Sequence, residues 1–409
     1  MIRMPITVLM VALCMLLRPA FGQPFDSVQD EPEYKMEMPP SEEGQTAMDM
    51  VMPEHEMMVM APLGIPHNRF ASGTSWMPDS TPVYAYMSKQ GKWELMSHGA
   101  AHLAYDRMSG PRGDAKLVMP NWVMVMARRS LSEKSTLQLR GMLSLDPETV
   151  GGSGYPLLFQ TGETWGGEPL RDHQHPHNFI SELSALYFRA LSSDSAGFLY
   201  LAPVGEPALG PPTFMHRTFA LDDPLAPIGH HWQDSTHIAF GVVTAGYCTR
   251  KLQLEASSFT GREPGENRYT IERMRFDSYS GRVSYNPNAN LALQFSHGFL
   301  DSPEALHPED NTRRTTASAV YNQALGAGRN FQSTFVWGRN TISGRETDIF
   351  LFEAQWKHDG GWTPYLRHEY AQKDAEELVV EGFPAHQVFR LGQTTIGVVR
   401  DLPSRGKLQ

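Results

Sequence analysis

From about Lys92 to the end of the chain, short segments alternate apolar and polar side chains. Residues 251–256, for example, read Lys-Leu-Gln-Leu-Glu-Ala. A period of two is that of a β-strand with one apolar and one polar face. The sequence therefore predicts an all-β, antiparallel protein with about fourteen strands. The expected strands cover residues 92–106, 121–129, 137–145, 180–190, 197–202, 237–242, 251–256, 279–285, 291–295, 315–321, 331–337, 350–356, 362–370 and 388–399.

The connections between these segments are alternately long and short. Short turns follow the even-numbered segments, near residues 132–134, 192–194, 249–250, 286–288, 326–328 and 359–361. Two of the longer connections, 147–178 and 204–233, are very long. Bacterial outer-membrane barrels have short turns on the periplasmic side and longer loops outside. The parity predicts an antiparallel transmembrane β-barrel in the bacterial outer membrane. A secreted all-β protein of repeated hairpins is the alternative.

The start of the chain has the features of a secretory leader. Arg3 gives a positive start, residues 6–17 form an apolar stretch too short to span a membrane, and Ala20-Phe21-Gly22 offers a cleavage site. We expect residues 1–22 to be a signal peptide. Residues 23–82 are rich in Pro and Glu and are expected to form a mobile periplasmic arm. The turn formers around Trp76 at its end would suit docking against or inside the barrel.

Residues 83–409 are the expected barrel. Its last residues, Pro403–Lys407, read as one more turn, and Leu408-Gln409 reads as the start of another strand. An open sheet edge in lipid leaves backbone groups unpaired at high cost. We therefore expect the chain to be truncated at its C-terminus and to lack about two strands of a barrel of about sixteen. The alternative is closure by residues 388–399.

Composition narrows the class of protein. The chain is 41% hydrophobic and 10% aromatic, and it has no apolar run long enough for a transmembrane helix. This suits a barrel wall and excludes a helical membrane protein. A formal charge of −10 argues against nucleic acid as a partner and is compatible with gathering cations. The expected partners are outer-membrane lipid and the barrel-assembly machinery.

The arm is the first candidate for metal binding. Thioether sulfur is a soft ligand that needs no deprotonation, so a flexible Met/His chain can hold Cu(I) or Ag(I). Neighbouring glutamates would add charge attraction. The alternative is a low-complexity tail in which methionine has no ligand role. The candidate ligands are Met36, Met38, Met48, Met50, Met52, His55, Met57, Met58 and Met60.

The two long loops are the second candidate. Imidazole and carboxylate groups together suit a borderline divalent ion such as Zn(II), Cu(II), Ni(II) or Co(II). The alternative is that these histidines stabilise a folded-in constriction through hydrogen bonds. The candidate ligands are His173, His175, His177, His216, His230, His231 and His237. Met96, His98 and His102 on the polar face of the first strand are further candidates, lining the lumen.

Enzymatic motifs are sparse. Ser and His, the residue types of a serine hydrolase, occur near Ser235. An outer-membrane phospholipase presents its nucleophile and base toward lipid. Here His237 alternates with apolar Ile238 and Phe240 and should therefore face the lumen. We expect no catalytic residues and no enzyme.

Four longer motifs of the chain resemble those of a known protein family. They are Gly73–Ser80, Ser109–Asp114, Gly154–Thr164 and Gly229–His237. They resemble a family of bacterial outer-membrane barrel proteins with a Met/His-rich N-terminal stretch, associated with copper and heavy-metal resistance. The resemblance covers nearly all of the mature chain, and the family continues beyond Gln409. His173 stands where the family's pattern has Arg, and Asn178 stands where it has Asp, so the carboxylate of that pattern is absent here.

These observations predict an outer-membrane barrel that binds or passes metal ions, copper above all, in metal homeostasis. The arm would exchange ions with the lumen and with periplasmic metal-handling proteins, and the long loops would narrow the outer mouth. One alternative is a general small-solute channel whose histidines are structural. Another is a structural or adhesion barrel without transport. No cofactor other than a copper ion is expected.

Overall fold

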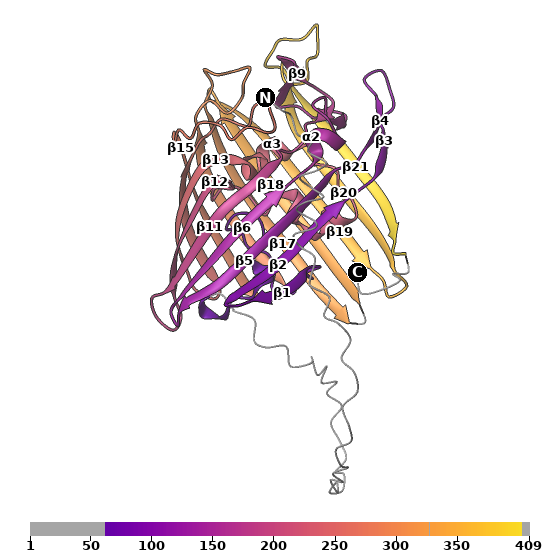
Figure 1. Cartoon of the computed structure of the whole chain (residues 1–409). Helices are drawn as coiled ribbons and strands as arrows, with labels where there is room; N and C mark the ends of the chain where they lie inside the picture. The colour runs from indigo at the N-terminus through magenta and orange to yellow at the C-terminus, as the bar shows by residue number, and fades with distance from the viewer. Residues whose placement is uncertain (1–61, 327, 403–409) are drawn as a thin grey trace, which may run out of the picture. The chain divides into compact units, whose positions relative to one another are not determined.

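The computed structural model describes residues 62–326 and 328–402. The expected signal peptide and the arm methionines lie outside these residues. One antiparallel sheet of 15 strands dominates the fold (Figure 1). Its strands are β1 (Tyr86–Gln90), β2 (Trp93–Ala101), β5 (Asn121–Ser132), β6 (Ser135–Leu143), β11 (Ile180–Ala190), β12 (Ala196–Gly205), β13 (Ala239–Cys248), β14 (Leu252–Phe259), β15 (Ser278–Asn288), β16 (Leu291–Leu300), β17 (Thr312–Gly326), β18 (Arg329–Ile342), β19 (Arg345–Lys357), β20 (Trp362–Asp374) and β21 (Val388–Arg400).

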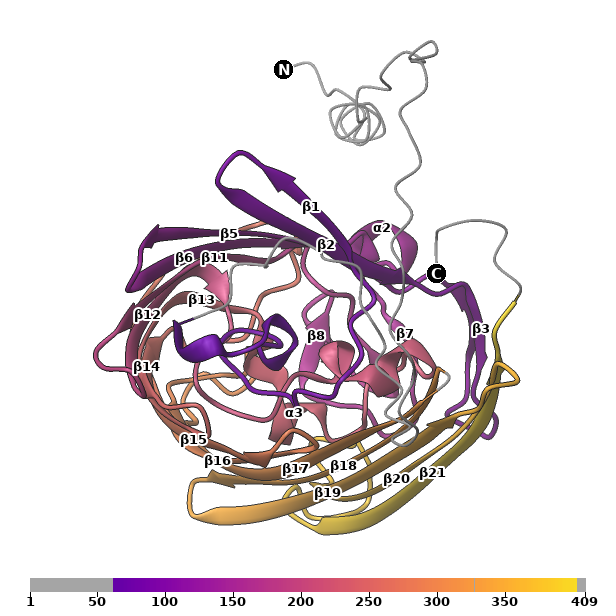
Figure 2. The same ribbon diagram turned by 90° about the horizontal axis from the view of Figure 1, so that it is seen from below.

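The strands pair in chain order, each with the next long strand, and the sheet curls around a central space (Figure 2). This confirms the predicted all-β antiparallel fold. The sheet matches a β-barrel, but its two edge strands do not pair with each other. Within the described residues, β21 pairs with β20 alone and β1 with β2 alone. The alternative in which residues 388–399 close a barrel of fourteen strands is therefore not what the structure shows.

Three local predictions differ from the structure. The expected first strand divides into β2 and β3 (Ala104–Arg107), and β3 pairs with β4 (Ala115–Val118) in a separate hairpin. The additional strand β1 precedes β2, so the sheet has 15 strands rather than about fourteen. At the end of the sheet that carries the long loops, β18 and β19 are joined by a two-residue turn, in which Gly344 has a φ of +82°. This turn is short, although it lies on the side where the sequence predicted longer connections.

The two faces of the wall differ in chemistry. In β15, Tyr279 and Val283 are exposed on the outer face, while Ser280 and Arg282 are buried on the inner face. The same alternation recurs around the sheet. Exposed outer residues include Leu199, Leu201, Val243, Leu254, Phe295, Phe335, Phe350, Phe352 and Ile396. Among the described residues, no helix is long and apolar enough to cross a membrane.

The space inside the sheet is occupied by chain. Residues 62–82, which include η1 (Pro62–Gly64) and η2 (His67–Arg69), bury Phe70 and Trp76 against wall residues such as Phe198. Residues 62–82, which the sequence pattern assigned to the arm, thus pack inside the sheet. The two long loops also fold inward. They carry α2 (Asp146–Thr149), β7 (Tyr155–Pro156), β8 (Glu163–Trp165), β9 (Glu168–Leu170), β10 (His173–Gln174), η3 (Phe214–His216), η4 (Thr218–Leu221), α3 (His230–Gln233) and η5 (Ser235–His237).

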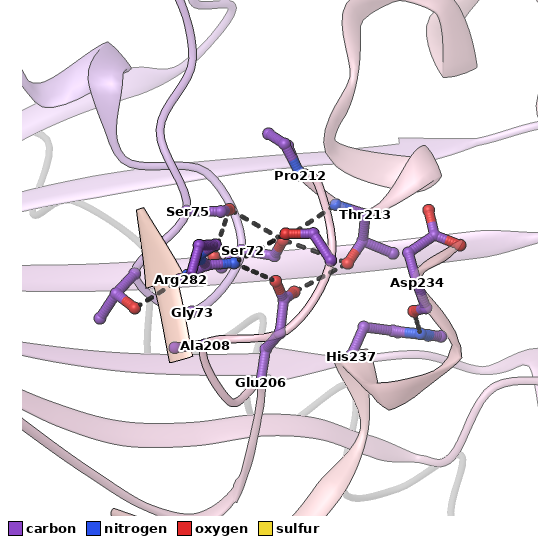
Figure 3. Close-up of polar contacts among 12 residues, drawn as sticks. Ser72, Gly73, Ser75, Glu206, Ala208, Pro212, Thr213, Asp234, His237 and Arg282 are labelled. Atoms are coloured by element: carbon purple, nitrogen blue, oxygen red, sulfur yellow. Dashed lines mark hydrogen bonds and ion pairs between the residues drawn. The ribbon is translucent and has the colours of Figure 1, made fainter. Parts of the chain in front are cut away.

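Polar contacts fasten these inner segments to each other and to the wall (Figure 3). Ser72 donates to Thr213, at 3.2 Å, and Thr213 donates to Glu206, at 2.7 Å. Arg282 of β15 lies 3.6 Å from the same Glu206 carboxylate. Because these groups are buried, each needs its partner, and the network holds the inward-folded loop in one position.

Candidate metal centre

Five of the predicted histidines meet inside the sheet. His175 and His177 follow β10, His230 and His231 begin α3, and His237 ends η5. All five are buried. The ring of His230 lies 5.1 Å from that of His237 and 5.3 Å from that of His231, measured between ring centroids. His175 lies 5.8 Å from His231, and His177 lies 5.4 Å from His237. We call these five residues the histidine cluster.

Each imidazole of the histidine cluster is held by its Nδ1 atom. His177 Nδ1 lies 2.7 Å from an Asp146 carboxylate oxygen, and His230 Nδ1 lies 2.7 Å from Asp234 Oδ1. The remaining contacts are His237 to the Asp234 carbonyl at 3.0 Å, His175 to the Pro176 carbonyl at 3.2 Å and His231 to Glu263 at 3.3 Å. An Nδ1–H group donating to oxygen fixes the tautomer in which Nε2 carries the lone pair.

The Nε2 atoms of the histidine cluster face the interior. All five are buried, and none makes a hydrogen bond among the described residues, although His175 Nε2 lies 3.2 Å from a Glu163 carboxylate oxygen. Leaving one buried polar group unpaired costs about 1–3 kcal/mol, so five in one place need an explanation. Imidazoles anchored through Nδ1 with Nε2 available are the usual arrangement of metal-ligating histidines.

Glu163 completes a possible set of ligands. One oxygen of Glu163 and one ring nitrogen each of His175 and His231 all lie within 4.8 Å of one another. The Glu163 carboxylate is 3.2 Å from His175 Nε2 and is held by Arg268 at 2.8 Å. Two imidazoles and a carboxylate, with a further position open, are a donor set that Zn(II) accepts. The other imidazoles of the cluster lie beside this group.

The electrostatics of the site keep most of these rings neutral. Burial lowers the pKa of His175 well below its ordinary value, and Arg268 acts in the same direction. Burial also lowers the pKa of His230 and of His237. His231 differs: burial opposes its protonation, but the carboxylates of Glu263 and Glu163 raise its pKa overall. A neutral imidazole is the form that binds a metal ion, so His175, His230 and His237 are ready to bind a cation, whereas a protonated His231 would have to release its proton.

Asp234 organises two of the five histidines. Its carboxylate accepts from His230 and from the backbone N–H of Phe214, the latter at 2.8 Å, and lies 3.2 Å from Arg217. Burial alone would raise the pKa of Asp234, but the hydrogen bond from His230 and the nearby cations lower it to about 2. The group therefore stays ionised and orients His230.

An acidic cavity of about 380 Å³ lies beside the cluster, between the first long loop and the loops that follow β14, β16 and β20. Burial and the neighbouring Glu377 carboxylate raise the pKa of Glu304, in its wall, to about 8. Carboxylates crowded in this way favour a bound cation over mutual repulsion. Its acidic lining residues are Glu163, Glu263, Glu272, Glu304, Glu376 and Glu377.

Other predicted residues lie elsewhere. His173 contacts Asp114 at 3.2 Å and makes no ring contact with the cluster in the described structure. The His216 ring lies 5.1 Å from the Trp122 ring, which in turn lies 5.2 Å from the His98 ring. His102 is half-buried and contacts the Leu221 carbonyl at 3.3 Å. The Asn178 amide accepts from Arg268 at 3.4 Å, so this position contacts the arginine that holds Glu163.

The sequence did not single out the carboxylates of the site. Asp146, Glu163 and Glu263 come from three separated stretches of chain, and only the folded loops bring them to the histidines. Asp234 did carry a signal, because it stands four residues after His230, within one helical turn.

Comparisons with known proteins find similarity in fold alone. No protein-family model matches the chain, and no curated protein matches it by sequence. Among solved structures, Salmonella typhi OmpF in complex with daunomycin is similar at 11% identity, covering 78% of this chain and 89% of that chain with a TM-score of 0.48. Pseudomonas aeruginosa OccK8 is 12% identical, covers 68% of each chain and has a TM-score of 0.32. A mutant of Rh. blastica porin is 11% identical, covering 75% and 100%, with a TM-score of 0.29.

Proposed function

We propose that this protein is a bacterial outer-membrane β-barrel that binds a borderline divalent metal ion, Zn(II) or Cu(II), at the histidine cluster and passes it across the membrane in metal homeostasis. The observation that carries the proposal is the set of five buried imidazoles whose Nε2 atoms lack hydrogen-bond partners among the described residues. Glu163 supplies the negative charge that a divalent cation needs.

The outer face of the sheet supports the membrane location. Large apolar side chains are exposed on it, whereas most of the buried polar side chains of the wall lie on the inner face. In water such a surface would aggregate, whereas in lipid it is the stable arrangement. The long loops, with the acidic cavity among them, would then stand at the outer mouth.

The packed interior favours metal binding over the passage of general solutes. Histidines that served only to hold a constriction would satisfy both ring nitrogens, because a buried unpaired nitrogen is destabilising. In the histidine cluster only one nitrogen of each ring is hydrogen-bonded. The inward-folded loops also occupy the region in which an open pore would lie (Figure 2).

Cobalt binding tests the proposal. Co(II) titrated into the full chain, folded in detergent, should give the intense visible absorption of a low-symmetry site. The double variant His175→Gln/His231→Gln should lose it. The matched control is His297→Gln/His368→Gln, which removes two exposed strand histidines bonded to Thr315 and Thr394. Equal cobalt binding by the two variants would contradict the proposal.

The arm has a proposed role of its own. Its eight methionines and His55 would bind Cu(I) and deliver it to or receive it from the barrel. A peptide covering residues 36–60 should bind Cu(I) more tightly than the same peptide with every methionine changed to leucine. Equal affinities of the two peptides would contradict Cu(I) binding by the methionines of the arm.

A further inference from the structure

A second group of soft ligands lies on the inner face of the wall, away from the histidine cluster. In the register of β2 and β5, Met96 stands opposite Met126 and His98 stands opposite Met124. Met124 in turn stands opposite Met142 of β6. Cβ atoms of directly paired residues lie about 4.5–5.5 Å apart, so these side chains form one continuous surface. All four methionines are buried, with at most 7% of each exposed.

The inward-folded loop adds to this surface. Met215 and His216 of η3 belong to the same region, and a cavity of about 120 Å³ lies between loop and wall. The Trp122 ring stands 5.2 Å from the His98 ring and 5.1 Å from the His216 ring. We call Met96, Met124, Met126, Met142, Met215, His98 and His216 the methionine patch.

Methionine is confined to this part of the wall. Strands β11 to β21, all of whose residues the structure describes, contain none. Their buried inner positions are mostly Ser, Thr, Gln, Asn, Arg and Glu. In β5 the outward positions beside the patch are Val123 and Val125, so apolar β-branched residues are used where only lipid contact is required. Where the inner face of the other strands is apolar, as at Leu186, Phe188 and Phe198, its residues are aliphatic or aromatic, so filling space inside the wall does not require thioethers.

The ligand types of the cavity point to a particular class of ion. Five methionines, Met77 included, line it, and none of its lining residues is Asp or Glu. His98 Nε2 is buried and has no hydrogen-bond partner among the described residues. Neutral sulfur and nitrogen ligands suit a soft monovalent cation and suit a hard divalent one poorly.

We propose that the methionine patch is a binding site for a soft monovalent metal ion, Cu(I) or Ag(I), separate from the site at the histidine cluster. Thioethers of Met96, Met124 and Met126 and the Nε2 atom of His98 would be its principal ligands. The site does not depend on the proposed divalent site. Trp122, Met215 and His177 line one cavity of about 20 Å³, so the two sites are neighbours in the same interior.

Silver binding to paired variants tests this proposal. The experiment uses the chain without its expected signal peptide (residues 1–22), folded in detergent, with the eight arm methionines changed to leucine and Cys248→Ser in every sample, so that every remaining sulfur lies between Met77 and Met274. Calorimetric titration with Ag(I), which has no competing redox chemistry, should show one tight equivalent. Met96→Leu/Met124→Leu/Met126→Leu should weaken that binding at least tenfold. Leucine is close to methionine in volume, so the wall should still pack.

The matched control changes three other methionines. Met87→Leu/Met119→Leu/Met274→Leu should leave Ag(I) binding unchanged. Co(II) binding at the histidine cluster should persist in both triple variants, which shows that the fold is retained and separates the two proposals. Unchanged silver affinity in the patch variant would overturn the proposal.

X-ray absorption supplies a measurement that does not depend on a folded triple variant. In the common background loaded with Cu(I), the patch predicts scattering from sulfur ligands around copper. Copper surrounded by nitrogen and oxygen alone would overturn the proposal, whatever the triple variants do.

Discussion

At the scale of single residues, the candidate metal centre depends on the groups that hold its imidazoles. Asp146 and Asp234 each fix an Nδ1 atom at 2.7 Å and leave Nε2 directed inward. Carboxylates in this position set the tautomer of a ligating histidine and increase its basicity. The affinity for a metal ion should therefore depend on residues that never touch it.

Changing Asp234 tests this dependence. Asp234→Asn keeps the size of the side chain but removes the charge beside His230. We expect the affinity for Zn(II), measured by calorimetric titration, to fall about 10–100-fold. The control is Asp348→Asn, which alters a carboxylate paired with Arg339 on β18. A Zn(II) affinity unchanged by Asp234→Asn would show that His230 takes no part.

The protonation of His237 gives a pH-dependent prediction. Burial, with His230 and His177 nearby, lowers its pKa well below the ordinary 6.5. As pH falls below 6.5, His237 is therefore protonated in the unfolded chain before it is protonated in the folded protein. This difference lowers the free energy of unfolding of the wild-type protein as pH falls. The metal-free variant His237→Gln should gain stability relative to wild type between pH 7.5 and pH 5, as measured by urea unfolding in detergent. A difference that does not change with pH would contradict the shifted pKa.

At the scale of elements, the inward-folded loop from Glu206 to Ile238 carries three of the five cluster histidines. Arg217 ties it to the wall through Glu353 of β19, at 2.9 Å, and to Asp234, at 3.2 Å. The Arg217 side chain is fully buried. Removing Arg217 leaves Glu353 paired with Arg367 alone and Asp234 paired with His230 alone, so two buried carboxylates each lose a cation, which is costly.

The variant Arg217→Ala should thus loosen this loop. We expect a loss of about 3–5 kcal/mol of stability and faster hydrogen exchange across residues 213–237. The control Arg339→Ala breaks pairs with Asp348 and Glu346 that are partly exposed, with 35% of the arginine side chain accessible, and should cost under about 1 kcal/mol. Unchanged exchange in the loop of the Arg217 variant would show that other contacts fix it.

At the scale of the whole molecule, the apolar outer face and the filled interior are stabilised by different surroundings. The outer face requires lipid, and the interior requires every polar group to find a partner. Phe335 lies in the middle of β18 and is 46% exposed on the outer face. Gln323 lies near the short-turn end of β17, on the same face.

Arginine substitutions on this face test the membrane proposal. Phe335→Arg should reduce the stability of the barrel in lipid vesicles by about 2–4 kcal/mol, as measured by urea titration of folding. Gln323→Arg, close to the membrane boundary, should cost about 0–1 kcal/mol. If the two substitutions had equal effects, the outer face would not be in contact with the lipid core.

The sequence predicted most of the wall because alternation is a local property. β15 and β16 agree with their segments, whereas β1 was missed because Tyr86–Gln90 has no regular alternation and is exposed throughout. The histidines were predictable as residue types. Their partners Asp146, Glu163 and Glu263 were not, because contacts across long loops depend on how those loops fold inward. Met124 and Met126 were not predicted, because they alternate with Val123 and Val125, which are apolar as well.

Crystals of the full chain loaded with Zn(II) would test the central proposal most directly. Diffraction data collected on either side of the zinc absorption edge locate bound zinc without reference to the protein atoms. The histidine cluster predicts an anomalous peak among Glu163 and the Nε2 atoms of His175 and His231. Zinc found only outside this cluster, or no zinc peak at all, would contradict the metal-binding function.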